Sequence, residues 1–424
     1  MEQNEDTRLK EFRQLKNEIR ESRDYLVVGI DVAKERHYAF FGTAAGKTLL
    51  RKLVFDNTKE GFEKLLFHAA TLKTRHALTK AVFGLEPTGD YHKPLGEYLI
   101  THDQILVLVA GSAVKKNREL LTGRWDRNDT KDAANIADLV TQGKCLFYEH
   151  PAPLVRELRA LLSLKRKLKK LEPASMVRIR NHLIAQYFPE LDPYYRCTEG
   201  PAIVRWCFDP HELASLSFPA FASMVSRRNG GGSQEGRLLE IHTKAAQSIG
   251  CALTPAVPFE AQRILTTITQ TKAMLKEVDQ AIEKVCKGFP EYGCLMSIPG
   301  FGPDVSAKVL GALGNPHRFG SGRQVLKLAG LDLSGDKSGK REDTSMVISK
   351  KGKADLRYAL YQAALVASTG NHRFMHYFTT KLKGREREKG IGTKLRVKLA
   401  AKMLIIAWTL MKKGEMFNPG CVDV

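Results

Sequence analysis

Residues 24–43 read DYLVVGIDVAKERHYAFFGT, an apolar run, a polar break and a second run rich in aromatic residues. Two such runs joined by a short polar segment are typical of an antiparallel hairpin. The stretch TLLRKLVFD at 48–56 predicts a third strand. Three strands in succession depart from the pattern of a plain doubly wound nucleotide-binding sheet. No GxGxxG follows the first strand, so nothing supports dinucleotide binding.

Helical and strand patterns alternate over the next hundred residues. An Asn/Thr cap signal opens a helix at 57–72, where apolar residues recur at helical spacing. The later elements are a buried strand at 81–87, a helix at 90–102, a strand at 104–110 and a helix beginning near Asp129. The order β-β-β-α-β-α-β-α predicts a mixed α/β domain at 25–150, with helices flanking a sheet. Residues 1–24 form a charged N-terminal extension, expected as a loose helix.

The region 151–290 is predicted to be helical. Leucines recur at helical spacing over 158–171, and apolar residues from Ile264 to Val285 alternate spacings of four and three. That alternation is the seam of a coiled coil and favours an antiparallel helical hairpin or a dimer contact, although an amphipathic helix packed on its own domain explains it equally well. An insert at 187–258 is expected to be irregular, with a flexible RRNGGGSQEG. Four of its aromatic residues either pack in a core, which we favour, or stack on bases: Tyr194, Tyr195, Trp206 and Phe208.

A mainly helical C-terminal domain is expected at 291–424. It opens with LMSIPGFGPDVSAKVLGALG, in which two helices flank a Gly-rich turn. This arrangement is typical of a helix-hairpin-helix, whose backbone N–H groups can approach a DNA phosphate. A polar loop rich in Gly, Ser and Lys follows, and two clear helices complete the domain.

The chain is strongly basic. Its 424 residues include 67 Lys and Arg against 46 Asp and Glu, a net charge of +21, and residues 301–424 hold 23 of these basic residues against 10 acidic ones. Such an excess favours a polyanionic partner, above all nucleic acid, with phosphate contacts in the last third. Seven scattered cysteines without a CxxC pair indicate neither a disulfide framework nor a zinc site. With no long apolar stretch either, we expect a cytoplasmic protein without membrane contacts.

Four acidic residues stand out by position. Asp31 and Glu86 each end an apolar run, so their carboxylates project from the ends of predicted strands. Asp129 and Asp132 lie about one turn apart on one helix face. Each acid alone is explained as a turn or helix-start residue. Together they predict a cluster that needs cations, and oxygen ligands suit Mg²⁺ or Mn²⁺, a pair of which stabilises phosphodiester displacement.

Two sets of motifs resemble one family. GIDVAKE around Asp31, LEPTGDY around Glu86 and NDTKDAANIADL resemble the DEDD transposases of insertion sequences of the IS110 and IS1111 type, and SIPGFGPDVSAKVLGALG with ISKKGKADLRYALYQAALVA resembles their C-terminal signature. The resemblance implies an RNase H-like fold similar to the resolvase RuvC, then a coiled-coil region and a transposase domain. It also implies that Asp31, Glu86, Asp129 and Asp132 are the DEDD quartet.

The resemblance further implies a serine nucleophile within an SG pair of the C-terminal loop. Ser338 matches best by its distance from ISK, and Ser334 fits less well. Its attack on phosphorus would give a covalent protein–DNA intermediate. The neighbouring basic residues could hold the scissile phosphate and the flanking nucleic acid: Lys337, Lys340, Arg341, Lys350, Lys351 and Lys353.

Partners and alternatives follow from the same resemblance. It implies donor and target DNA, a structured bridge RNA as guide, and a homo-oligomer, dimer or tetramer, whose sites combine domains of two subunits in a bacterial, nucleoid-associated setting. Two other functions remain open. One is a hydrolytic junction resolvase or DNA invertase that uses only the carboxylates, and the other is a non-catalytic nucleic-acid-binding protein whose acids are structural.

Overall fold

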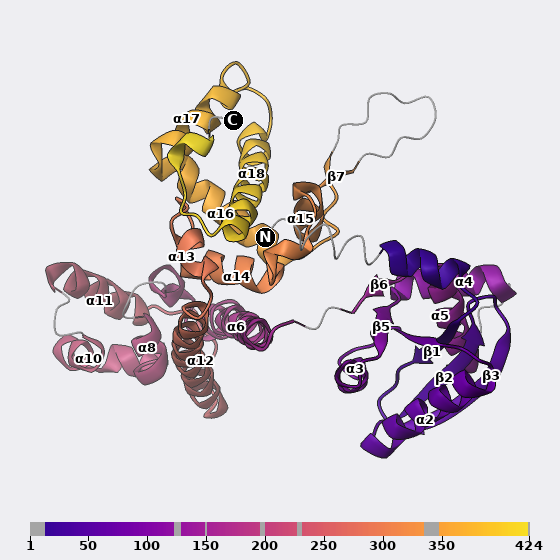
Figure 1. Cartoon of the computed structure of the whole chain (residues 1–424). Coiled ribbons are helices and arrows are strands. Elements are labelled where there is room, and N and C mark those ends of the chain that lie inside the picture. Colours follow the sequence, from indigo (N-terminus) through magenta and orange to yellow (C-terminus); the bar gives the residue numbers. More distant parts are fainter. Residues whose placement is uncertain are drawn as a thin grey trace. The chain divides into compact units, whose positions relative to one another are not determined.

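The chain folds into two compact units, which are described separately below (Figure 1). The N-terminal unit comprises residues 1–151 with 315–321, and the C-terminal unit comprises the remainder. The computed structural model describes residues 13–122, 129–148, 151–195, 200–226, 231–334 and 347–422. Within these ranges, no helix combines the length and the apolar character that a bilayer span requires. The cysteines described there, Cys145, Cys207, Cys251, Cys286 and Cys294, are free thiols.

A six-stranded mixed sheet forms the centre of the N-terminal unit, in the order β3-β2-β1-β4-β5-β6. The first three strands are antiparallel, β4 and β5 run parallel to β1, and β6 is antiparallel to β5. This confirms the predicted hairpin and the mixed sheet, while β6 was not predicted. The strands are β1 (Tyr25–Asp31), β2 (Arg36–Thr43), β3 (Thr48–Asp56), β4 (Lys80–Leu85), β5 (Ile105–Leu108) and β6 (Leu146–Phe147).

Helices cover both faces of this sheet. The helices are α2 (Lys59–Arg75), α3 (His92–Thr101), α4 (Gly111–Thr122) and α5 (Asp129–Thr141). Side chains of successive strand residues point to opposite faces, so Val28 packs in one core with α2 and α3. Val27 packs in the other core with α4 and α5. The predicted cap of α2 is confirmed at Thr58, whose Oγ1 accepts from the Gly61 N–H at 3.2 Å.

The α5 helix lies directly on the sheet because the strand residues beneath it are glycines. Gly29 of β1 and Gly84 of β4 are register partners. A Cβ added at Gly29 would stand 2.1 Å from the carbonyl oxygen of Ala133, and one at Gly84 would stand 2.5 Å from Cγ2 of Val140. No side chain fits between helix and sheet at these points. The first turn of α5 is therefore held close to the end of β1.

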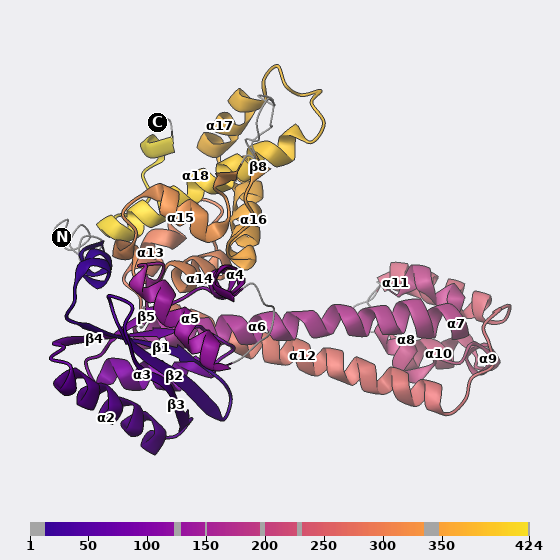
Figure 2. The same cartoon turned by 90° about the vertical axis from the view of Figure 1, so that its right-hand side faces the viewer.

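Two long helices of the C-terminal unit form an antiparallel pair. They are α6 (Pro153–Val177) and α12 (Ala256–Cys286), which lie side by side in Figure 2. Lys165 pairs with Asp279 at 2.5 Å and Glu172 pairs with Lys272 at 3.4 Å. From the first pair to the second, the residue number rises by seven on α6 and falls by seven on α12, so the two helices run in opposite directions. This confirms the helical hairpin, while a coiled-coil geometry stays a prediction.

The predicted apolar seam is only partly covered within one chain. Ile268 and Ile282 of α12 are buried, as is Leu158 of α6. Leu164 and Leu171 on α6, in contrast, are 44% and 48% exposed. Among the described residues, part of the apolar stripe on this helix is therefore exposed.

The insert is helical, so the predicted irregular structure is wrong. Its helices are α8 (Gly200–Trp206), α9 (Pro210–Ser215), α10 (Phe218–Val225) and α11 (Gly231–Ala245). Their apolar side chains share one core with the start of α12, and tertiary packing of this kind overrides the low helix propensity of the glycines that open α11. Residues 227–230 of the expected flexible stretch lie outside the described ranges. Tyr194, Tyr195 and Phe208 are buried, as the core interpretation predicts, whereas Trp206 is 60% exposed.

The C-terminal domain contains the predicted helix pair around the Gly-rich turn. Gly300 in this turn has φ +87°, and a Cβ there would stand 2.4 Å from the carbonyl oxygen of Ala363. The glycine therefore permits close packing of a third helix, and DNA contact at this turn stays a prediction. The elements are α13 (Glu291–Met296), α14 (Pro303–Leu313), α15 (Gly322–Ala329), β7 (Leu333–Ser334), β8 (Val347–Ile348), α16 (Ala354–Gly370), α17 (His372–Leu382) and α18 (Ile391–Lys413).

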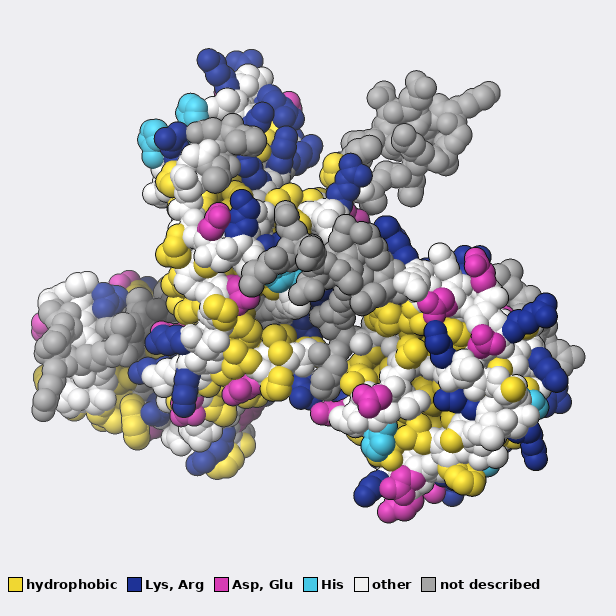
Figure 3. Space-filling view, in the orientation of Figure 1, with side chains coloured by type: hydrophobic (Ala, Val, Ile, Leu, Met, Phe, Trp, Pro, Cys, Tyr) yellow, Lys and Arg dark blue, Asp and Glu magenta, His cyan; other side chains and the backbone are white. Residues whose placement is uncertain are grey.

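Basic side chains gather over the α17–α18 end of this unit (Figure 3). The connection between these helices reads KGREREKG, and its residues are exposed. It is also held by local pairing, since Arg385 binds Glu388 at 2.8 Å. The basic excess of the last third of the sequence is thus displayed on the surface, where it can meet an anion.

We expect Gly29→Ala to destabilise the N-terminal unit by about 2–3 kcal/mol, because the new methyl group overlaps the backbone of α5. The measurement is the urea midpoint followed by circular dichroism. Gly236→Ala in α11 is the control, since nothing lies within 4 Å of a Cβ at that position. An unchanged midpoint for Gly29→Ala would contradict the close helix–sheet contact.

Candidate active site

Asp31 and Glu86 lie at the same edge of the sheet. The parallel register pairs Ile30 of β1 with Leu85 of β4, so the two acids occupy the next position on adjoining strands. Alternation along β1 directs Asp31 to the face of Val27, which is the face that α5 covers. The sequence prediction that both carboxylates project from strand ends is thereby consistent with the register.

The carboxylate of Glu86 lies against the start of α4. A Cβ at Gly111 would stand 2.7 Å from Glu86 Oε1, so glycine leaves room for this side chain. Backbone pairing fixes the neighbouring strand, since the N–H of Val109 donates to the carbonyl oxygen of Leu85 at 2.9 Å. The position of Glu86 therefore depends on both β5 and the first residue of α4.

Asp132 stands on the first turns of α5 and faces an arginine of α4. Its Oδ1 lies 2.7 Å from Nη2 of Arg118, and the two side chains are only 10% and 19% exposed. Asp132 immediately precedes Ala133, whose carbonyl oxygen contacts Gly29 two residues before Asp31. The glycine contact thus holds the α5 backbone next to Asp132 against β1, at a point two residues before Asp31.

A buried polar network also joins α4 to α5, next to the Arg118–Asp132 ion pair in the sequence. Nδ2 of Asn117 donates to Oδ1 of Asn135 at 2.6 Å and to Oδ2 of Asp138 at 2.8 Å. Nδ2 of Asn135 in turn donates to the carbonyl oxygen of Val114 at 2.8 Å. Satisfied buried amides of this kind hold one geometry, because any shift leaves a polar group unpaired. Sequence reasoning missed α4 and this network, because Asn117 lies among charged residues and gives no signal that it will be buried.

His37 holds the turn that follows Asp31. It is fully buried in β2, and its Nδ1 accepts from the N–H of Ala33 at 3.2 Å. The ring packs against Phe55 and Phe62. Burial lowers the pKa of His37, so the ring stays neutral and keeps its acceptor nitrogen. This positioning residue was also missed, since a single histidine in a strand carries no motif.

The quartet itself is only partly described. The backbone of Asp129 begins α5, but its side chain lies outside the described residues. Among the side chains that are described, no three Asp, Glu, His or Cys groups converge in a metal-binding arrangement. Asp31 and Glu86 fit a hard cation by their oxygen chemistry and shared edge, whereas Asp132 is engaged by Arg118. The complete four-acid site stays a prediction.

The predicted nucleophile lies outside the described residues, as do Lys337, Lys340 and Arg341. The described chain stops at Ser334, whose side chain is likewise not described, and resumes at Val347. These two residues are register partners in the β7–β8 hairpin. The segment that contains Ser338 therefore starts and ends at one small antiparallel hairpin.

The basic stretch after this hairpin has a fixed backbone. The N–H of Lys350 donates to the carbonyl oxygen of Gly330 at 3.1 Å, and that of Lys353 donates to Leu328 at 2.8 Å. A Cβ at Gly352 would stand 2.3 Å from the Gly330 nitrogen, so the two glycines allow the segments to touch. Lys350, Lys351 and Lys353 are all exposed, in agreement with their predicted nucleic-acid contacts, which stay untested.

We expect Arg118→Gln to lower the free energy of unfolding of the N-terminal unit by about 2–4 kcal/mol, because it leaves the buried Asp132 carboxylate without its cation. The double variant Arg118→Gln/Asp132→Asn should recover part of this loss. Urea unfolding of the unchanged chain, the two single variants and the double variant forms a double-mutant cycle, which measures the coupling energy between the two side chains. Strict additivity would show that the two side chains are not coupled.

Two family profiles match the chain. Residues 28–189 match the profile of DEDD transposases of the IS110 type, which is described as a transposase. Residues 292–379 match the profile described as transposase, IS116/IS110/IS902 family. The first match contains Asp31, Glu86, Asp129 and Asp132, and the second contains Ser338.

Two curated relatives are similar over most of the chain. An "Insertion element IS116 uncharacterized 44.8 kDa protein" of Streptomyces clavuligerus is 24% identical over 412 residues, which are 93% of this chain and 97% of the relative. A "Transposase for insertion sequence element IS1111A" of Coxiella burnetii is 22% identical over 295 residues, 70% and 69% of the two chains. The N-terminal α/β sheet is consistent with the first profile, and the chain belongs to the IS110-type family of DEDD transposases, enzymes that cut and rejoin DNA in mobile elements.

Proposed function

We propose that this transposase cuts and rejoins DNA through a covalent phosphoserine intermediate at Ser338, with a metal-binding quartet of Asp31, Glu86, Asp129 and Asp132. The observation that carries the proposal is the β1–β4 register, in which Asp31 ends β1 and Glu86 directly follows the last residue of β4. The close contact of α5 with Gly29 supports Asp132 as a third member. The DEDD family match suggests dependence on a divalent metal.

The carboxylates and the serine have separate roles in this mechanism. A divalent cation held by the quartet would neutralise charge on the phosphodiester. The Ser338 Oγ–phosphorus bond forms as the bond from phosphorus to a deoxyribose oxygen breaks, and the serine proton passes to that oxygen. One phosphodiester replaces another, so the intermediate conserves bond energy and rejoining needs no ATP. Lys337, Lys340 and Arg341 flank the serine in sequence and can stabilise charge on the phosphate.

The proposal includes a structured guide RNA and a homo-oligomer. Guide recognition is supported by the net charge of +21, which favours a polyanionic partner such as RNA. In such a mechanism base pairing reads the DNA sequence, while the protein holds backbones. Assembly is supported by Leu164 and Leu171, which stay exposed on the apolar stripe of α6. A second copy covering this stripe would bury them.

Ser338→Ala should abolish both the SDS-resistant protein–DNA adduct and strand exchange, with DNA binding unchanged, because only the attacking oxygen is removed. Labelled DNA carrying the element's ends, incubated with Mg²⁺ and resolved by gel, measures both products. Ser334→Ala, four residues earlier at the end of β7, is the matched control and should retain full yield.

Other outcomes of this experiment identify the alternatives. Loss of the adduct in Ser334→Ala alone would move the nucleophile to that residue. Cleavage that persists at full yield in both serine variants would instead favour a hydrolytic resolvase. Activity that also survives Glu86→Gln would leave only a non-catalytic role for the acids.

The guided mechanism predicts that one RNA species co-purifies with the chain in excess. Sequencing the RNA bound to protein purified from cells that carry the complete element should recover a discrete transcript. The control is the same purification after ribonuclease treatment. Recovery of nothing beyond a random sample of cellular RNA would contradict guidance.

A further inference from the structure

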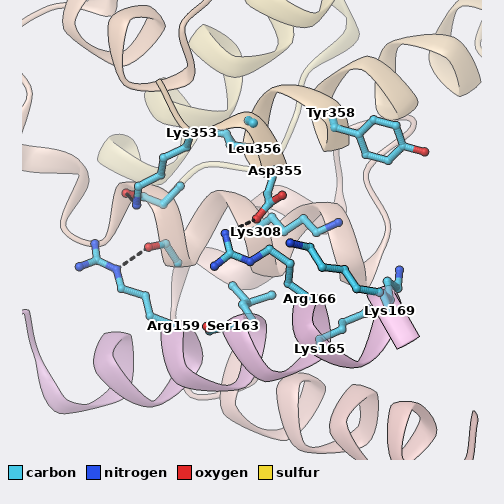
Figure 4. A pocket seen from close by; sticks show the side chains of 15 residues that line it. Arg159, Ser163, Lys165, Arg166, Lys169, Lys308, Lys353, Asp355, Leu356 and Tyr358 are labelled. Atoms are coloured by element: carbon cyan, nitrogen blue, oxygen red, sulfur yellow. Dashed lines mark hydrogen bonds and ion pairs between the residues drawn. The ribbon is translucent and has the colours of Figure 1, made fainter. Parts of the chain in front are cut away.

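A basic pocket opens between three helices of the C-terminal unit (Figure 4). We call it the α6–α14–α16 pocket, after the helices that line it together with Lys353. Its volume is about 520 Å³, within the range of roughly 300–1,000 Å³ that is typical of ligand sites. Seven Lys and Arg side chains line it against one acidic residue, Asp355, so an anionic occupant is favoured.

An ion-pair network supports the pocket wall. Lys165 binds both Asp279 of α12 and Asp304 at the start of α14, and Lys308 binds the same Asp304 at 2.7 Å. Burial alone would raise the pKa of Asp304, but hydrogen bonds from Lys165 and Lys308 lower it to about 2. The aspartate thus stays charged, and these two lysines are occupied in fixing the helices to one another.

Arg159, Lys169 and Lys170 of the pocket pair with no carboxylate among the residues that the structure describes. Arg159 is half-buried, its Nε donates to the carbonyl oxygen of Gly311 at 2.7 Å, and no carboxylate in the described ranges pairs with it. Burial lowers the pKa of this guanidinium, as expected where a charge is partly removed from water. Lys169 and Lys170 are exposed, and within the same ranges neither forms an ion pair. An incoming anion would meet these three side chains.

The arrangement suits an extended phosphate backbone rather than one small ion. In Figure 4 Arg166 and Lys169 extend from α6 toward α14 and the start of α16, and a dashed line joins Arg166 to Asp355. Tyr358, which also lines the pocket, is 63% exposed and can stack on a sugar or base. Cations beside an exposed aromatic ring are the combination that single-stranded nucleic acid contacts.

We propose that the α6–α14–α16 pocket binds the phosphodiester backbone of nucleic acid through Arg159, Lys169 and Lys170. The inference rests on the proposed function only in taking nucleic acid as the ligand. Lys353 contributes to the pocket and follows the β7–β8 hairpin by five residues, so the pocket belongs to the same domain as the serine segment. Its role is to hold a strand, distinct from the chemistry assigned to Ser338.

Binding as a function of salt tests this inference. The full chain is titrated into a fluorescein-labelled DNA and, separately, an RNA of equal length, at salt from about 0.05 to 0.2 M. For Lys169→Gln/Lys170→Gln, the slope of log affinity against log salt should fall in magnitude by about 2, since two phosphate contacts are lost. If the slope falls with only one of the two probes, that result identifies whether the pocket binds DNA or RNA.

The matched control is Lys167→Gln/Lys276→Gln. Both residues are exposed, Lys167 belongs to the same helix, and neither lines the pocket. The control removes the same charge and should leave the slope unchanged. An equal fall in the control, or no fall with either probe in the pocket variant, would overturn the inference. Adduct formation is scored in parallel, so a failure of the pocket is distinguished from a failure of the serine mechanism.

Discussion

The N-terminal unit depends on the contact between α5 and two glycines of the sheet. Gly29 and Gly84 sit opposite each other on adjoining parallel strands, and their missing side chains let the helix backbone touch β1. Because β1 ends at Asp31, this contact determines how closely α5 lies on the end of β1. Larger side chains at the two glycine positions would move α5 away from the sheet.

The two units treat charge differently. In the N-terminal unit a buried carboxylate is paired with an arginine, whereas in the C-terminal unit basic side chains accumulate around one pocket. At the acidic edge, Arg118 already compensates Asp132, which keeps a buried carboxylate tolerable. A cation bound by the proposed quartet would therefore have to compete with Arg118 for Asp132. In the C-terminal unit Asp279 and Asp304 together balance Lys165 and Lys308 of the pocket wall. Arg159, Lys169 and Lys170 pair with no carboxylate among the described residues, so the pocket keeps its attraction for polyanions.

Much of the fold follows from local patterns. The alternation around Asp31, the cap at Thr58 and the spacing of four and three along α12 each depend on neighbours within a few residues, and the structure confirms the elements they predict. The insert at 187–258 was misjudged because its short helices have weak local signals and gain their stability from a shared core. The helix α4 and the small strand β6 were missed for the same reason.

The sequence by itself determined the basic excess and, in the N-terminal unit, the first five strands and the helices α2, α3 and α5, near whose ends the four acids lie. Only the tertiary structure decided which of these acids pairs with an arginine, because Arg118 on α4 and Asp132 on α5 meet only when the two helices pack together. It also decided that the pocket exists, since Lys165 and Asp304 are distant in sequence and meet only when α6 and α14 pack. The spacing of apolar residues in the sequence predicts which face of its own helix or strand a residue occupies. Its contacts with other helices and strands depend on how those elements pack.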